Sequence, residues 1–373
     1  MSTMEQTIET SVTYVESKTQ WQLIWRQFTR HRMALASLVV LSFLYVVGVF
    51  SPEFFAPHSV NTRFDSFLPP QGIHFVDAEG DFHLRPFVYG WKKELDRKTF
   101  KTTYTPDTSQ KYPIRFLVQG SPYKLWGIIP SSMHFIGVDE GGILCLWGTD
   151  NLGRDMFSRS IFALRISLTI GLVGVFISLV LGLIIGGVSG LVGGPVDNVI
   201  QRFIEVIMSI PTIPLWMALA AAVPREWSAV QVYFAITVIL SLVGWTGLAR
   251  VVRSKFISLR EMDFVTAAEG YNASQMTIII QHLIPNFLSY VVVNLTLAIP
   301  DMILAETSLS FLGLGLRPPT VSLGVLLSRA QDLQTVAMHP WLLIPGALVV
   351  IVVLAFNFVG DGLRDAADPY QLN

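Results

Sequence analysis

The sequence predicts an all-α polytopic membrane protein with six transmembrane helices and a β-rich insert outside the membrane between the first two. Hydrophobic residues make up 51% of the 373 residues, charged residues only 14%, and the mean hydropathy is +0.52, which is too apolar for a soluble domain. Apolar runs of membrane-spanning length recur along the chain. The net charge of -1 excludes a basic nucleic-acid-binding surface, and the single cysteine, Cys145, excludes an intramolecular disulfide.

Residues 1–32 are expected to form a cytoplasmic tail that ends in an interfacial helix. Tryptophan, phenylalanine and arginine side chains alternate between residues 21 and 32, a composition typical of a helix at the membrane surface. The arginines favour the cytoplasmic side. The apolar run 33–50 then provides about 18 residues, or about 27 Å of helix, which is enough to cross the hydrocarbon core once.

Residues 51–165 form the predicted extracytoplasmic insert. Short alternating runs at 73–76 and 82–85 predict a β-hairpin, and runs at 133–138 and 143–147 predict a second one. The basic residues of the insert do not argue against an external position, because long translocated segments largely escape the positive-inside rule.

The insert ends in a turn that is dense in glycine and charged residues. The turn contains Gly148, Thr149, Asp150, Gly153, Arg154 and Asp155. Its aspartates could pair with Arg154 or Arg159 and fix the angle at which the next helix enters the membrane. The alternative is a plain surface turn.

Residues 166–361 are predicted to be the transmembrane domain. An interfacial stretch at 156–164 precedes the second span at 166–187. Glycines recur there and just beyond at every fourth position: Gly182, Gly186, Gly190 and Gly194. Such a stripe leaves one helix face bare, so that another helix can approach closely.

Four more spans are expected after the glycine stripe. The third begins as a helix at Asp197 and reaches about residue 223, with kinks at Pro211 and Pro214. The others lie at 230–248, 287–304 and 341–359. The connection 308–340 is expected to be external or re-entrant, and residues 362–373 form a cytoplasmic tail.

Two carboxylates lie at the fifth span. Asp301 is inside it and Glu306 follows it. A carboxylate at bilayer depth costs about 2.5–3.5 kcal/mol, so both are expected near the outer boundary or facing the protein interior.

The polar segment 261–286 lies between the fourth and fifth spans. Basic residues cluster directly before it, so we place it in the cytoplasm. Phe264, Ala268 and Tyr271 fall on one helix face, and Asn272 can cap a second helix. The pattern predicts a helix, a sharp turn and a helix, with a solvated loop as the alternative.

Four motifs occur in a fixed order along the chain. They are the turn at 148–155, DFVTAAEG at 263–270, ETSLSFLGLG at 306–315 and GDGLRD at 360–365. Together they resemble the permease subunits of ABC importers, specifically the C-type permease of the dipeptide, oligopeptide and nickel branch. The sequence departs from the pattern at Thr266, where the family usually has glutamate, and at Asn272, where it usually has glycine.

The resemblance implies a type I ABC importer permease fold and identifies 261–286 as the ATPase-coupling loop. The residues that it assigns to coupling are Asp263, Phe264, Thr266, Ala267, Ala268, Glu269, Gly270, Tyr271, Ala273 and Ser274. The implied partners are a second homologous permease, two ATP-binding subunits, an extracytoplasmic substrate-binding protein and the inner-membrane bilayer. The implied cargo is a dipeptide or oligopeptide, with oligosaccharide or nickel as alternatives.

Phosphate-loop, GxSxG and HExxH motifs are absent from the sequence. We therefore expect no catalytic residue, bound cofactor or metal in this chain, and ATP and Mg belong to the partner ATPases that the resemblance implies. Six spans would leave both termini in the cytoplasm. An ATP-independent channel or secondary transporter is the other class of function that the missing ATP site and the two carboxylates allow.

Overall fold

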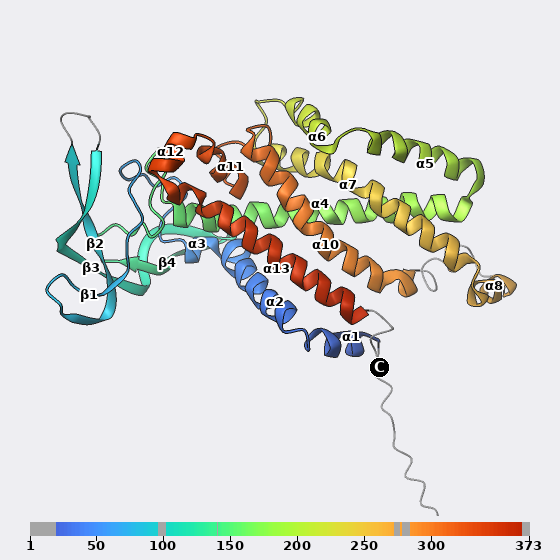
Figure 1. The fold of residues 1–373 in the computed structure, drawn as a ribbon, viewed down its shortest axis with the longest axis horizontal. Coiled ribbons are helices and arrows are strands. Elements are labelled where there is room, and N and C mark those ends of the chain that lie inside the picture. The colour runs from blue at the N-terminus through green and yellow to red at the C-terminus, as the bar shows by residue number, and fades with distance from the viewer. Residues whose placement is uncertain (1–19, 96–101, 140, 272–276, 278–283, 368–373) are drawn as a thin grey trace, which may run out of the picture.

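A bundle of long helices carries a β-sheet at one end and the short helix α8 (Asp263–Gly270) at the other (Figure 1). We call these the sheet end and the α8 end. The computed structural model describes residues 20–95, 102–139, 141–271, 277 and 284–367.

The first half of the chain contains α1 (Gln20–Phe28), α2 (Arg32–Leu44), the π-helical turn η1 (Tyr45–Phe50), α3 (Pro52–Phe55), β1 (His74–Val76), β2 (Phe82–Leu95), β3 (Thr102–Leu125), β4 (Ile129–Val138) and α4 (Met156–Val192). The second half contains α5 (Gly194–Ser209), α6 (Thr212–Ala221), α7 (Ala229–Arg260), α8, α10 (Ile284–Phe311), α11 (Leu323–Leu327), η3 (Ser328–Ala330), α12 (Leu333–Met338), η4 (Pro340–Leu343) and α13 (Ile344–Ala367).

Five helices of the described chain are long and apolar enough to cross a membrane: Arg32–Phe50, Met156–Val192, Ala229–Leu259, Tyr290–Phe311 and Pro340–Ala367. A sixth crossing requires α5 and α6 to count as one span, and these two helices meet at an angle of 86°. The kink predicted at Pro211 is therefore a break. Ile210 has the extended backbone that residues before proline prefer, with φ -89° and ψ 128°, and this conformation ends α5.

Two helices extend beyond the predicted spans. Helix α4 runs unbroken from 156 to 192, so the expected interfacial stretch and second span are one helix, and its 37 residues reach about 55 Å. Helix α13 continues to Ala367, so the motif at 360–365 and the first residues of the predicted tail are helical. Hydropathy marks only the most apolar part of a helix, and both helices continue past the apolar runs that defined the predicted spans.

The four strands form an antiparallel sheet in the order β1-β2-β3-β4. Val76 pairs with Phe82, as the first predicted hairpin requires. The second predicted hairpin is wrong, because residues 143–147 form no strand and β4 pairs with β3, with Leu125 opposite Ile129. The polar sequence of β3 lacks the apolar alternation that marks a strand.

Asp77 anchors the turn between β1 and β2. Its Oδ1 accepts hydrogen bonds from the backbone N–H groups of Glu79 and Asp81, at 3.0 and 2.9 Å. Its Oδ2 lies 2.6 Å from Lys111 Nζ and 2.8 Å from His83 Nε2. Lys111 and His83 hold the pKa of the Asp77 carboxyl well below its usual range, so this carboxylate stays charged and binds β3 to the turn.

The N-terminal helices pack against α13 at the α8 end. Phe28 is buried, and a β-carbon at Gly362 would collide with Ala34 Cβ. Figure 1 shows the end of α13 beside α1. The described chain therefore begins and ends at the same end of the bundle.

Candidate functional site

Helix α7 is long and positions α8 beyond the end of the bundle (Figure 1). Its 32 residues reach about 48 Å, which exceeds the roughly 30 Å of a hydrocarbon core by about 18 Å. Only Glu261 and Met262 separate α7 from α8. The C-terminal end of α7 therefore holds α8 at a distance from the centre of the bundle (Figure 1).

Among the described side chains of α8, Val265 packs against the bundle. Val265 is 1% exposed and packs with Val252 and Phe256 of α7 and with Val291 of α10. Tyr271, in contrast, lies just beyond α8 and is 90% exposed. Helices α7 and α10 therefore cover the side of α8 that contains Val265 and leave Tyr271 uncovered.

The outer side of α8 is open. Four of the predicted coupling residues are exposed there: Asp263, Thr266, Ala267 and Gly270. No other described atom would lie within 4 Å of a β-carbon at Gly270. Outside the described residues lie the side chains of Phe264, Ala268 and Glu269, and all of Ala273, Ser274 and the start of the second predicted helix.

Three of the four predicted glycines face α7: Gly182, Gly186 and Gly190. A β-carbon at Gly186 would collide with the carbonyl oxygen of Ala249, and one at Gly190 would lie 2.9 Å from that of Arg253. The bare face thus allows the α4 and α7 backbones to touch. Gly194 is not part of this face, because it begins α5 with φ 56° and no described atom would lie within 4 Å of its β-carbon.

An ion pair joins three helices beside this glycine face. Arg253 of α7 donates from Nε and Nη2 to the carboxylate of Asp197 on α5, both at 2.5 Å. Ser189 of α4 donates to the same carboxylate, and Gln201 donates to the Ser189 hydroxyl at 2.9 Å. A two-pronged arginine–carboxylate pair is geometrically specific. The pair therefore links the start of α5 directly to α7.

At the sheet end, the turn at 148–155 is internally hydrogen-bonded. Asp150 accepts hydrogen bonds from the backbone N–H groups of Leu152 and Arg154, and its carboxylate pairs with Arg154 Nη2 at 2.6 Å. Thr149 donates to the carbonyl oxygen of Asp65 and accepts from the N–H of Leu68. Asp150 and Thr149 are both buried, so the turn is not a plain surface turn.

Asp155 begins α4 rather than pairing with an arginine. Its carboxylate accepts hydrogen bonds from the N–H groups of Phe157 and Ser158, at 3.3 and 2.8 Å. This N-cap satisfies two backbone donors of the first helical turn. Burial raises the pKa of Asp155, while the nearby His58 and the donors of the cap oppose that rise.

Glu306 lies in a fully buried cluster of hydroxyl groups near the same end. The hydroxyls of Ser310 and Ser322 lie 2.7 Å from its Oε1, and that of Ser167 lies 3.1 Å from its Oε2. These serines belong to α10, the segment before α11 and α4. The cluster therefore joins three parts of the bundle, in agreement with an interior-facing Glu306, whereas Asp301 is exposed on α10.

Each serine of this cluster also accepts a backbone N–H. Leu316 donates to Ser310, Leu323 to Ser167 and Val325 to Ser322, at 3.0 to 3.2 Å. The carboxylate thereby fixes the path of the connection between α10 and α11.

Sequence reasoning missed Val265, the Asp197–Arg253 pair and the serine partners of Glu306. The only feature of the sequence that pointed to the serine partners was the presence of a carboxylate, Glu306, in an apolar run. Asp197 and Arg253 are 56 residues apart, and no local spacing relates them.

The chain matches two families of known proteins. Residues 153–371 match the family described as "Binding-protein-dependent transport system inner membrane component". Residues 19–70 match "N-terminal TM domain of oligopeptide transport permease C".

Individual relatives cover nearly the whole chain. The "Dipeptide transport system permease protein DppC" of Lactococcus lactis is 33% identical over 94% of this chain and 90% of its own. The "Oligopeptide transport system permease protein OppC" of Haemophilus influenzae is 32% identical over 95% and 90%. An inward-facing structure of the MetNI methionine ABC transporter is 21% identical over 57% of this chain and 97% of its own, with a TM-score of 0.44.

Proposed function

The chain belongs to the family of binding-protein-dependent transport system inner membrane components, and we propose that it forms half of the pore of an ATP-driven importer of dipeptides or oligopeptides. The peptide cargo is proposed because the relatives that match nearly the full chain are named as dipeptide and oligopeptide permeases. The proposed partners are a second homologous permease, two ATPase subunits that bind ATP and Mg, and an extracytoplasmic binding protein.

The observation that supports this proposal is that α8 is packed against the bundle on one side and exposed on the other. Val265 fixes one side of the helix to α7 and α10, while Asp263, Thr266 and Gly270 remain exposed on it. A movement of an ATPase bound to this exposed side would therefore be transmitted to α7 and α10 together. Shifting the populations of the two states of a pore from 1:99 to 99:1 requires about 5.5 kcal/mol of differential binding free energy. We propose that α8 transmits this difference to the pore.

A substitution at Gly270 tests this coupling. Gly270→Arg adds a long cation at a position whose β-carbon meets no described atom within 4 Å, so we expect it to obstruct a partner on the open side of α8. In the reconstituted complex, we expect ATP hydrolysis stimulated by loaded binding protein to fall at least roughly tenfold, about 1.4 kcal/mol of lost coupling.

Gly270→Ala is the matched control for this test. Its β-carbon meets the same open space, and alanine favours a helix over glycine by about 1 kcal/mol, so we expect near wild-type stimulation. Full stimulation in Gly270→Arg, with uptake intact, would instead favour an ATP-independent channel or secondary transporter.

The proposed orientation places the sheet end outside the inner membrane and the α8 end in the cytoplasm. The single cysteine, Cys145, is buried, so it gives little background in thiol labelling. Leu84→Cys in β2 and Tyr271→Cys beyond α8 introduce thiols at positions that are 87% and 90% exposed.

We expect a membrane-impermeant maleimide to label Leu84→Cys but not Tyr271→Cys in intact spheroplasts. Inside-out vesicles should show the reverse pattern, because a polar reagent does not cross the hydrocarbon core. Labelling of Tyr271→Cys in spheroplasts would refute this orientation.

A further inference from the structure

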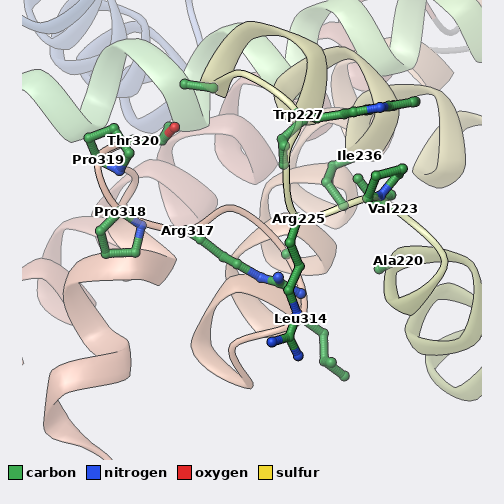
Figure 2. A pocket seen from close by; sticks show the side chains of 14 residues that line it. Ala220, Val223, Arg225, Trp227, Ile236, Leu314, Arg317, Pro318, Pro319 and Thr320 are labelled. Atoms are coloured by element: carbon green, nitrogen blue, oxygen red, sulfur yellow. The ribbon is translucent and has the colours of Figure 1, made fainter.

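A small pocket lies between the turn that joins α6 to α7 and the segment that follows α10. Val223, Arg225 and Trp227 line it from the first side, and Leu314 and Arg317 from the second (Figure 2). Its volume is about 120 Å³, well below the roughly 300–1,000 Å³ of sites that enclose a whole drug-sized ligand. The pocket can therefore hold one end of a longer molecule.

Two arginines give this pocket its charge. Figure 2 shows the side chains of Arg225 and Arg317 extending toward the same part of the pocket, near Leu314. Neither guanidinium has an ion-pair or hydrogen-bond partner in the part of the chain that the structure describes. Glu226 follows Arg225 in the sequence, but it does not line the pocket and pairs with neither arginine.

The chemistry of the pocket suits a carboxylate that is attached to an apolar group. Two like charges in one pocket repel each other, and an anion between them removes that repulsion. The planar fork of an arginine also matches the two oxygens of a carboxylate. The remaining wall contains apolar side chains, including Val223, Trp227 and Ile236.

We propose that Arg225 and Arg317 bind the terminal carboxylate of a peptide as it passes from the binding protein into the pore. This inference rests on the proposed function. The pocket lies at the end of α10 that faces away from α8, which in the proposed orientation is the side from which the substrate arrives (Figure 1). Its size fits a chain end rather than a whole peptide.

The test compares two substrates in the complete reconstituted complex. Uptake of trialanine and of trialanine amide is measured for the wild type and for the Arg225→Gln, Arg317→Gln double variant. Each variant rate is divided by the wild-type rate for the same substrate, which cancels any preference of the binding protein. We expect trialanine uptake to fall at least roughly tenfold and amide uptake to change less than about twofold, because only trialanine carries the carboxylate.

Arg329→Gln is the matched control, since Arg329 is an exposed arginine near the same end that does not line the pocket. It should leave both rates unchanged. An equal fall for both substrates, or no fall for either, would overturn the inference.

The same double variant separates the substrate from the other source of a carboxylate, an acidic side chain of the binding protein. Weaker binding of the loaded binding protein to the complex, with both uptake rates reduced alike, would assign the pocket to that partner and overturn the inference. If the wild-type complex carries neither peptide, the proposed function itself fails, and the inference fails with it.

Discussion

Replacing Glu306 with alanine is expected to destabilise this permease by about 3 kcal/mol or more. The carboxylate accepts hydrogen bonds from the hydroxyls of Ser167, Ser310 and Ser322, and all four residues are buried. Each buried hydroxyl that loses its acceptor costs about 1–3 kcal/mol, and the deleted side chain also leaves a cavity. Thermal melting of the purified protein in detergent should show a lower midpoint, by roughly 4 °C or more.

Glu306→Gln is the control for this prediction. Glutamine has nearly the same shape, and its carbonyl oxygen can still accept from Ser310 and Ser322 while its amide donates to Ser167. We expect it to retain most of the stability. Equal melting midpoints for the alanine variant and the wild type would show that the cluster does not stabilise the connection between α10 and α11.

A Gly186→Ala substitution is expected to separate α4 from α7. The added β-carbon would collide with the carbonyl oxygen of Ala249 and lie 2.9 Å from its Cα, and a backbone atom cannot rotate away as a side chain can. Overpacking of this kind costs about 1–3 kcal/mol. Because α7 carries α8, we also expect stimulated ATP hydrolysis to fall with stability.

The adjacent Gly187→Ala substitution provides a matched comparison. Its β-carbon would lie 3.6 Å from Phe256, an ordinary contact, and the helix gains about 1 kcal/mol from alanine. Because alanine favours both helical positions equally, the two variants should differ by the overpacking cost alone, roughly 1–3 kcal/mol in unfolding free energy, with Gly187→Ala the more stable. Equal melting midpoints for the two would contradict close backbone packing of α4 against α7.

Hydropathy and spacing were sufficient for five of the six predicted membrane-crossing helices and for three of the four close-packing glycines. An apolar helix of bilayer length is stable in lipid whichever neighbour it has, so local composition reveals it. The glycine stripe is equally local, because a bare face follows from spacing alone. The spacing failed at Gly194, because α4 had already ended at Val192 and is followed by Gly193 with φ 65°.

Pairing between distant segments was not predictable in this way. Asp197 and Arg253 are 56 residues apart, and Ser167 and Glu306 are 139 apart. Each of these polar groups would be costly without a partner, but its partner depends on which helices are adjacent. The same holds for β3, whose polar sequence becomes a strand because β2 and β4 pair with it on either side.

In the segment 261–286, one feature was predictable from local sequence and another depended on distant contacts. The arginines before it and its motif identified it as a short helix at the end of the fourth span, and α8 lies there. The predicted partner-contact face includes Tyr271, which is 90% exposed, whereas the side that packs on the bundle through Val265 was not predicted. Helical spacing defines every face of a short helix equally well, and only the neighbouring α7 and α10 determine which face is covered and which is left for a partner.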